Sequence, residues 1–130
     1  MTYNLSKYVS NNSSIVPVTN GENPESTGDR VVLNGSGGDD RSRGLKVDNT
    51  VQFVSKANDS VTSKELIEEV HSLLKNRFDI VLPEITVKGT TYPAVIASSI
   101  LPLQIPGYLG TDNNGLHMWS VNYQITTKEE

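Results

Sequence analysis

Residues 117–127 read HMWSVNYQITT, and they indicate the fold more clearly than any other stretch of the chain. Apolar and polar side chains alternate here, so that in a β-strand they would point to opposite sides. One side would carry Trp119, Val121, Tyr123 and Ile125, and the other Ser120, Asn122, Gln124 and Thr126. This pattern predicts a half-buried antiparallel strand whose second side is formed by amides and hydroxyls.

A helical pattern covers residues 63–78. Its apolar residues are spaced three and four apart, which gathers them on one face of a helix. Thr62 and Glu65 have the spacing of a capping box, in which each side chain bonds a backbone N–H of the first turn. We expect this helix and the strand 117–127 to share one core. The predicted core residues are Leu66, Ile67, Val70, Leu74, Trp119, Val121, Tyr123 and Ile125.

Short β-branched segments on both sides of the helix predict further strands. Residues 30–34 and 50–56 should pair as antiparallel neighbours, and residues 80–88 and 94–105 should form strands after the helix. Residues 112–115 (DNNG) supply the turn before the last strand. The expected fold class is α+β, with a mostly antiparallel sheet of about four to five strands, one main amphipathic helix packed on it, and long polar loops.

Two segments are poor in apolar side chains. Residues 1–29 are expected to be a polar N-terminal arm with a possible short helix, because this stretch alone buries too little apolar surface to repay its ordering entropy. Residues 30–130 are expected to form a single α+β domain. Within it, four glycines and six charged residues make residues 35–49 a mobile hairpin loop.

Composition excludes several classes of function. The 130 residues contain no cysteine, which excludes disulfides, thiolate nucleophiles and cysteine-bound zinc. Eleven Lys and Arg against 15 Asp and Glu give a net charge of −4, so nucleic-acid binding is not expected as the main activity. The chain has no apolar run as long as a membrane span and no signal-peptide pattern, which favours a soluble protein made inside the cell.

The residues that could carry catalysis form no recognisable constellation. His71 and His117 are the only histidines, and neither has a spacing typical of a metal ligand. The glycine-rich residues 35–38 lack the Gly-Lys-Ser/Thr sequence of a phosphate-binding loop. We therefore expect no metal, no cofactor and no enzymatic activity. These features are typical of a subunit of an assembly.

The C-terminal part of the chain carries a longer pattern. Residues 106–125 read PGYLGTDNNGLHMWSVNYQI, a Pro-Gly-x-x-Gly-x-Asp-x-x-Gly turn that leads into the final strand. Together with Gly37-Gly38 and residues 51–54 (VQFV), this pattern resembles the tail terminator or "minor capsid" proteins of long-tailed bacteriophages, particularly those of Gram-positive hosts. The resemblance spans residues 30–127, and residues 106–125 are its specific part.

The resemblance implies a structural protein of the virion, located at the tail–neck junction and assembled in the cytoplasm of the bacterial host. Such a subunit is expected to form a homo-oligomeric, hexameric ring. The ring would end polymerisation of the tail tube protein and present a surface to the head-closure or connector protein. Genomic DNA would pass through it without specific binding, and no membrane would be involved.

Two sets of residues are candidate contacts of this ring. The loop 35–49 would supply an axial interface with the tube or head-closure protein, through Asp39, Asp40, Arg41, Arg43 and Lys46. The helix and the polar side of the last strand would supply lateral contacts between subunits, through Lys64, Glu68, Ser120, Asn122 and Gln124.

Two alternatives stay open at the level of sequence. Another neck component, such as a head-completion or stopper protein, would also form a ring. A small ligand-binding domain, from a different class of proteins, would place a pocket under Trp119 and Tyr123. Alternating aromatic and aliphatic residues are, however, what a buried strand face needs, which favours a core position for both aromatic residues.

Overall fold

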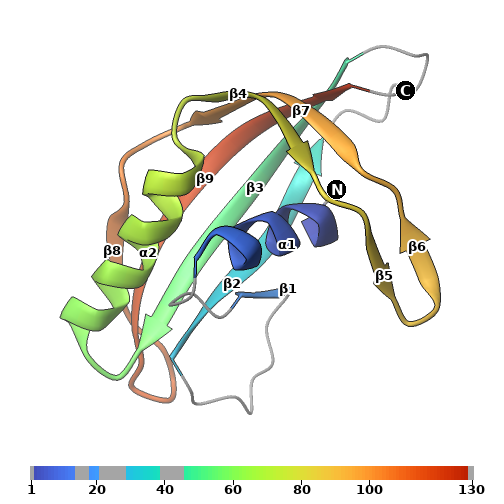
Figure 1. The fold of residues 1–130 in the computed structure, drawn as a ribbon. Helices are drawn as coiled ribbons and strands as arrows, with labels where there is room; N and C mark the ends of the chain where they lie inside the picture. The colour runs from blue at the N-terminus through green and yellow to red at the C-terminus, as the bar shows by residue number, and fades with distance from the viewer. Residues whose placement is uncertain (1, 14–17, 21–28, 39–45, 129–130) are drawn as a thin grey trace.

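The computed structural model shows a twisted, mostly antiparallel sheet with two helices on one of its faces (Figure 1). It describes residues 2–13, 18–20, 29–38 and 46–128. The elements along the chain are α1 (Thr2–Asn12), β1 (Val18–Asn20), β2 (Arg30–Gly38), β3 (Lys46–Ala57), α2 (Ser60–Leu74), β4 (Arg77–Leu82), β5 (Ile85–Val87), β6 (Thr90–Tyr92), β7 (Val95–Pro102), β8 (Gly107–Thr111) and β9 (His117–Lys128). The expected α+β class is confirmed.

β9 is the central strand of the main sheet, whose order is β1-β2-β3-β9-β7-β4 with β8 also paired to β9. β3 follows one edge of β9 along its whole length. The other edge is shared, because β8 pairs with residues 117–120 and β7 pairs with residues 123–128. Between these two strands the backbone N–H of Leu103 donates to the carbonyl of Asn122 at 2.9 Å. The strand predicted most clearly from sequence is therefore the one that holds the sheet together.

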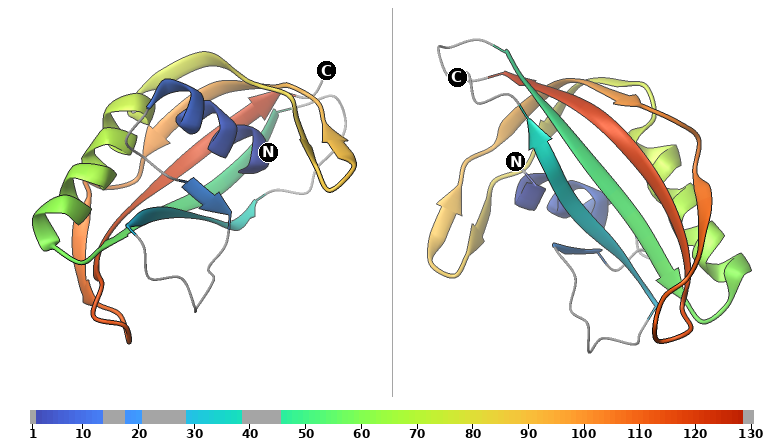
Figure 2. Two further views of the ribbon diagram at one scale, coloured as in Figure 1. Left: turned by 60° about the horizontal axis from the view of Figure 1, so that its bottom comes forward. Right: turned by 180° about the vertical axis from the view of Figure 1, so that it is seen from behind.

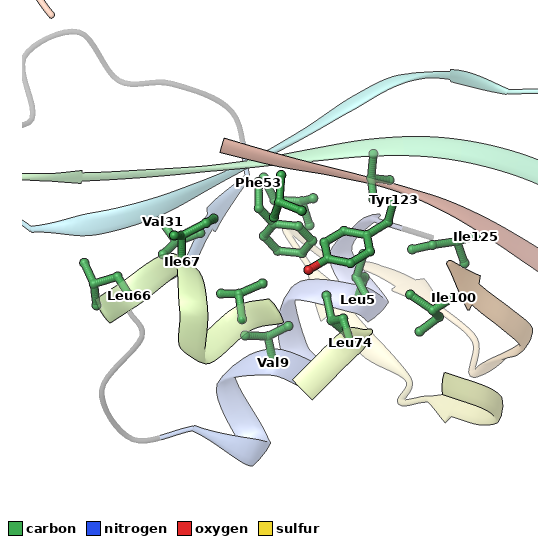
Figure 3. Packing of buried hydrophobic residues seen from close by; sticks show 14 of the residues in the cluster. Leu5, Val9, Val31, Phe53, Leu66, Ile67, Leu74, Ile100, Tyr123 and Ile125 are labelled. Atoms are coloured by element: carbon green, nitrogen blue, oxygen red, sulfur yellow. The ribbon is translucent and has the colours of Figure 1, made fainter. Parts of the chain in front are cut away.

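Both helices pack on the same face of the sheet, and the view from behind shows the opposite face without a helix over it (Figure 2). Phe53 of β3 and Tyr123 of β9 meet edge to face in the core, with ring centroids 5.9 Å apart (Figure 3). α1 adds Leu5 and Val9 to the same core. These two residues lie four apart on one helical face, so the short helix expected in the N-terminal arm is held by the sheet rather than by its own propensity.

The boundaries of α2 differ from the predicted helix 63–78. Asp59 is the N-cap, and its side chain accepts a hydrogen bond from the backbone N–H of Val61, so the predicted Thr62–Glu65 capping box is wrong. The helix ends at Leu74, and two residues later Asn76 takes a left-handed conformation with φ of 52°. Phe78 consequently lies in β4, where it is 60% exposed, instead of on the apolar face of the helix.

β2 and β3 are longer than the sequence predicted. Residues 30–34 and 50–56 pair as expected, but β2 continues to Gly38 and β3 begins at Lys46. Most of the predicted loop 35–49 is therefore strand, and the rest of it, residues 39–45, lies outside the described part of the chain. The extension of β3 has a physical cause, because β9 offers it ladder partners as far as Lys128.

The region after the helix contains more strands than expected. The predicted strand 80–88 is divided at Pro83 into β4 and β5, and the predicted strand 94–105 ends at Pro102 as β7. Proline has no N–H to donate to a ladder, which explains both breaks. β5 and β6 form a separate two-stranded hairpin, whose turn residues Lys88 and Gly89 have φ of 51° and 81°. Positive φ at both central residues is the requirement of a tight hairpin turn.

Candidate functional site

The side chains of His71 and Tyr123 form a contact between α2 and the core. His71 Nδ1 lies 2.7 Å from the Tyr123 hydroxyl. Burial lowers the pKa of His71, the charge of Lys75 lowers it further, and Glu68 acts in the opposite direction. Burial raises the pKa of Tyr123 well above its usual range. Both groups are therefore held neutral near pH 7, and the contact fastens the helix to the central strand.

The second histidine also pairs with a tyrosine. His117 Nδ1 lies 2.8 Å from the hydroxyl of Tyr108, and the two rings are stacked. Among the described residues no three His, Asp or Glu side chains are placed to hold a metal ion. The geometry offers a rigid aromatic surface at the start of β9.

A cleft of about 390 Å³ lies between α2 and the connection from β7 to β8. Its lining residues are Lys64, Glu68, His71, Ile105, Pro106 and Trp119. The Lys64 ammonium lies 5.6 Å from the centre of the Trp119 ring, and Trp119 Nε1 is buried without an acceptor among the described residues. Trp119 lines this cleft and Tyr123 does not, although Tyr123 bonds the lining residue His71.

The five candidate lateral residues lie on different faces of the sheet. Lys64 and Glu68 sit on the helix side, where their charged ends are 3.7 Å apart and more than half exposed. Ser120, Asn122 and Gln124 point to the other face. Along that face exposure increases from buried Ser120 to exposed Gln124. Ser120 lies between Gly107 of β8 and Val54 of β3. The set therefore belongs to two separate surfaces.

Most of the candidate axial residues are not among the residues that the structure describes. Asp39, Asp40, Arg41 and Arg43 lie outside the described residues, and Lys46 is the first residue of β3, paired in register with Lys128. These residues remain a prediction from sequence.

The eight residues predicted for the core all contact it. Seven of them are buried, namely Leu66, Ile67, Val70, Leu74, Val121, Tyr123 and Ile125. Trp119 is partly buried and packs against the cluster from its border.

The sequence reading missed a concentration of exposed apolar side chains along one border of the sheet. It comprises Phe78, Val81, Leu101, Leu103, Ile105, Tyr108 and Leu109, and we call it the apolar edge. Among the described residues only one other large apolar side chain is as exposed, Val61 on α2. The corresponding signal in the sequence is the uncharged segment around residues 101–109, whose pattern also fits a strand and its end.

The register places part of the apolar edge on the face without helices. Phe78 is opposite Ser99, and Ser99 is opposite Thr126 of β9. Leu101 is opposite Gln124. Because directly paired residues point to the same side of a sheet, Phe78 and Leu101 lie beside the polar stripe of β9. These two residues thus share the face without helices with amides and hydroxyls of β9, whereas Ile105 of the apolar edge lines the cleft beside α2.

Comparison with protein families identifies a match that covers most of this chain. A family model described as bacteriophage tail terminator protein matches residues 8–129, which is nearly the entire chain. None of the curated proteins compared with it matches. The match includes the turn and strand at residues 106–125, and it confirms the resemblance found there at the level of the family.

Proposed function

The chain belongs to the bacteriophage tail terminator family, and from this premise we propose that it forms a ring that caps the tail tube, ends its polymerisation and provides the surface for joining the head. Membership makes the protein a structural component of the virion that associates with other tail and head proteins. None of the helices described here is long and apolar enough to cross a membrane.

The observation that carries the proposal is the match over residues 8–129, and the shape of the subunit is consistent with it. A ring closes when one surface of a subunit contacts a different surface of the next and the rotation between them completes a circle. A tube stops growing when the ring bound to it presents an end unlike the end that it has covered. Neither task requires a reactive side chain, so shape and surface chemistry suffice.

The proposed contacts with other proteins divide between two parts of the chain. We assign axial contact with the tube or head-closure protein to Asp39, Asp40, Arg41, Arg43 and Lys46, whose mixed charges suit the polar rim of a protein interface. Lateral contacts between subunits are assigned to Lys64 and Glu68 on α2 and to Ser120, Asn122 and Gln124 on β9. We further propose a hexameric ring that allows genomic DNA to pass without specific binding.

The decisive experiment is electron microscopy of particles assembled without this protein. Loss of a tail terminator should yield tails of uncontrolled length that are not joined to heads, and supplying the wild-type chain should restore uniform, head-bearing tails. Uniform, joined tails in its absence would contradict the proposal.

The same micrographs distinguish a head-completion or stopper protein. Loss of such a protein should leave tails of normal length together with empty or leaking heads. Tail length is enough to distinguish the two outcomes, so one preparation decides between them.

A further inference from the structure

We propose that the apolar edge of one subunit docks into the groove between α1 and the β5–β6 hairpin of a second copy of this chain. This inference rests on the proposed ring, and it names the two surfaces by which neighbouring subunits would meet. The partner is a copy of the same polypeptide, and the contact is head to tail, because the two surfaces differ.

The first observation is the exposure of the apolar edge. Ile105 is 80% exposed, and Phe78 and Val81 are each 60% exposed. Along this border they reach both faces of the sheet, and large exposed apolar areas on soluble proteins mark interaction surfaces. Apart from Val61, every exposed large apolar side chain among the described residues lies on this border.

The second observation is charge. The chain carries a net charge of −4, and contact through surfaces with little charge avoids bringing the like charges of two copies together. Residues 89–111 contain no Asp, Glu, Lys or Arg, although these residues make up 20% of the chain. This segment carries five of the seven residues of the apolar edge. The longest uncharged stretch of the sequence is thus also the most exposed apolar one, which suits contact with another copy of an acidic chain.

The third observation is a receiving surface beside the β5–β6 hairpin. A groove of about 470 Å³ lies between α1 and β5. Its lining is largely apolar and comprises Tyr3, Ser6, Lys7, Ser10, Val18, Ile85 and Val87. The β5–β6 hairpin and β8, which carries Tyr108 and Leu109, lie at opposite sides of the molecule, whereas β4, which carries Val81, leads into β5 (Figures 1 and 2). Contact between two different surfaces is heterologous, and it produces a ring when the rotation closes.

The walls of this groove are already fixed in the single subunit. The side-chain amide of Asn4 donates hydrogen bonds to the carbonyls of Pro83 and Pro93 at 2.9 and 3.0 Å. Lys7 Nζ donates to the carbonyl of Glu84 at 2.7 Å. These bonds tie α1 to the residues just before β5 and just after β6, where the hairpin begins and ends. A groove that is formed before binding loses less conformational entropy when it is occupied.

The first test measures self-association of the purified full-length chain by sedimentation equilibrium over a range of concentrations. We expect Ile105→Asp to weaken association at least tenfold while leaving the melting temperature unchanged, since this side chain is almost fully exposed. Val61→Asp is the matched control, because it changes an equally apolar, 62% exposed side chain outside the apolar edge and should associate like the wild type.

The second test locates the contact with pairs of introduced cysteines, which are the only thiols because the chain has none. Mixing Ile105→Cys with Val87→Cys under mild oxidation should give disulfide-linked dimers of the two variants. Mixing Val61→Cys with Val87→Cys should give far fewer. Equal yields from the two mixtures would overturn the inference.

Other outcomes would also overturn it. A wild-type chain that stays monomeric at every concentration, or that associates only when the tail tube protein is added, would show that the apolar edge does not bind a second copy. Normal association of Ile105→Asp would reject this surface while leaving the proposed function intact. Uniform tails in the absence of the chain would instead reject the function, whatever the association experiments show.

Discussion

Large apolar side chains occur in two regions of this sheet, where they have different surroundings. On the helix side, apolar side chains of β3 and β9 meet those of α1 and α2 and are fully buried. On the border formed by β4, β7 and β8, equally large apolar side chains are open to solvent. Apolar composition therefore does not by itself distinguish a core from an interface. What distinguishes them is whether the same chain supplies the covering surface.

The contrast is tested most strongly by truncating one aromatic residue on the covered side. Phe53→Ala removes a fully buried ring that packs against Tyr123, so we expect the free energy of unfolding to fall by about 3–5 kcal/mol. Ile105→Ala on the apolar edge should change it by less than about 0.5 kcal/mol. Urea denaturation of both variants measures the difference. Similar losses would mean that the apolar edge is part of the fold.

The next largest effect concerns the turn that links the apolar edge to β9. The Asp112 carboxylate accepts the backbone N–H groups of Asn114 and Leu116, each at 2.9 Å, and Lys56 Nζ lies 3.4 Å from it. These bonds lower the pKa of Asp112, and the bond from the Leu116 N–H has the largest effect. Burial acts in the opposite direction and raises the pKa. We expect Asp112→Ala to cost about 2 kcal/mol, since hydrogen bonds to a charged group are the stronger ones.

Asn113→Ala is the matched control for this turn, because Asn113 is exposed and adjacent. Chemical denaturation should show little loss for it. If both variants were equally stable, the side chain of Asp112 would not be what holds the turn.

A smaller loss of stability is expected at the start of α2, on the covered side of the sheet. Asp59→Ala removes the N-cap acceptor and should destabilise the protein by about 1 kcal/mol. Thr62→Ala should cost less, because Thr62 only donates from its hydroxyl to the Asp59 carboxylate at 3.3 Å. Thermal denaturation compares them directly. A larger loss for Thr62→Ala would restore the capping box predicted from sequence.

The smallest expected effect is a pH dependence from His71, at the border between the core and the cleft. Its pKa in the folded protein is lowered from the ordinary value of 6.5 by burial and by Lys75. The unfolded chain therefore binds a proton more readily than the folded one. The stability that His71 contributes is present above pH 6.5 and is lost as the pH falls through that value towards the lowered pKa.

The measurement compares melting temperatures at neutral pH and at about one pH unit below the ordinary histidine value, where the shift operates. The wild type should lose more stability between the two than His71→Gln, which has no proton to gain. Parallel losses would show that His71 is not the group responsible.

Much of the fold could be predicted from sequence because the strongest patterns belong to elements with one buried face. The alternation in residues 117–127 and the three-and-four spacing in residues 66–74 each define a buried side without knowledge of a partner. Boundaries were harder to predict. The last apolar residue of the helical pattern, Phe78, belongs to β4, because a strand ladder with β7 was available to it.

The candidate site was predicted less well, for a related reason. Charged and polar side chains were selected as contacts because they are exposed in any fold. The apolar residues 101–109 were assigned to a strand, because an apolar side chain in sequence gives no sign of whether a neighbour covers it. Lys64 and Gln124 were grouped together, although the sheet separates their two faces.

The sequence by itself determined the α+β class, the buried faces of α2 and β9 and the family to which the chain belongs, since these depend on periodicity and on a local pattern of turn and strand residues. Only the tertiary structure decided which apolar side chains stay uncovered. Exposure depends on what packs against a residue from distant parts of the chain. Here the sheet receives both described helices on one face, and so leaves its β4–β7–β8 border open.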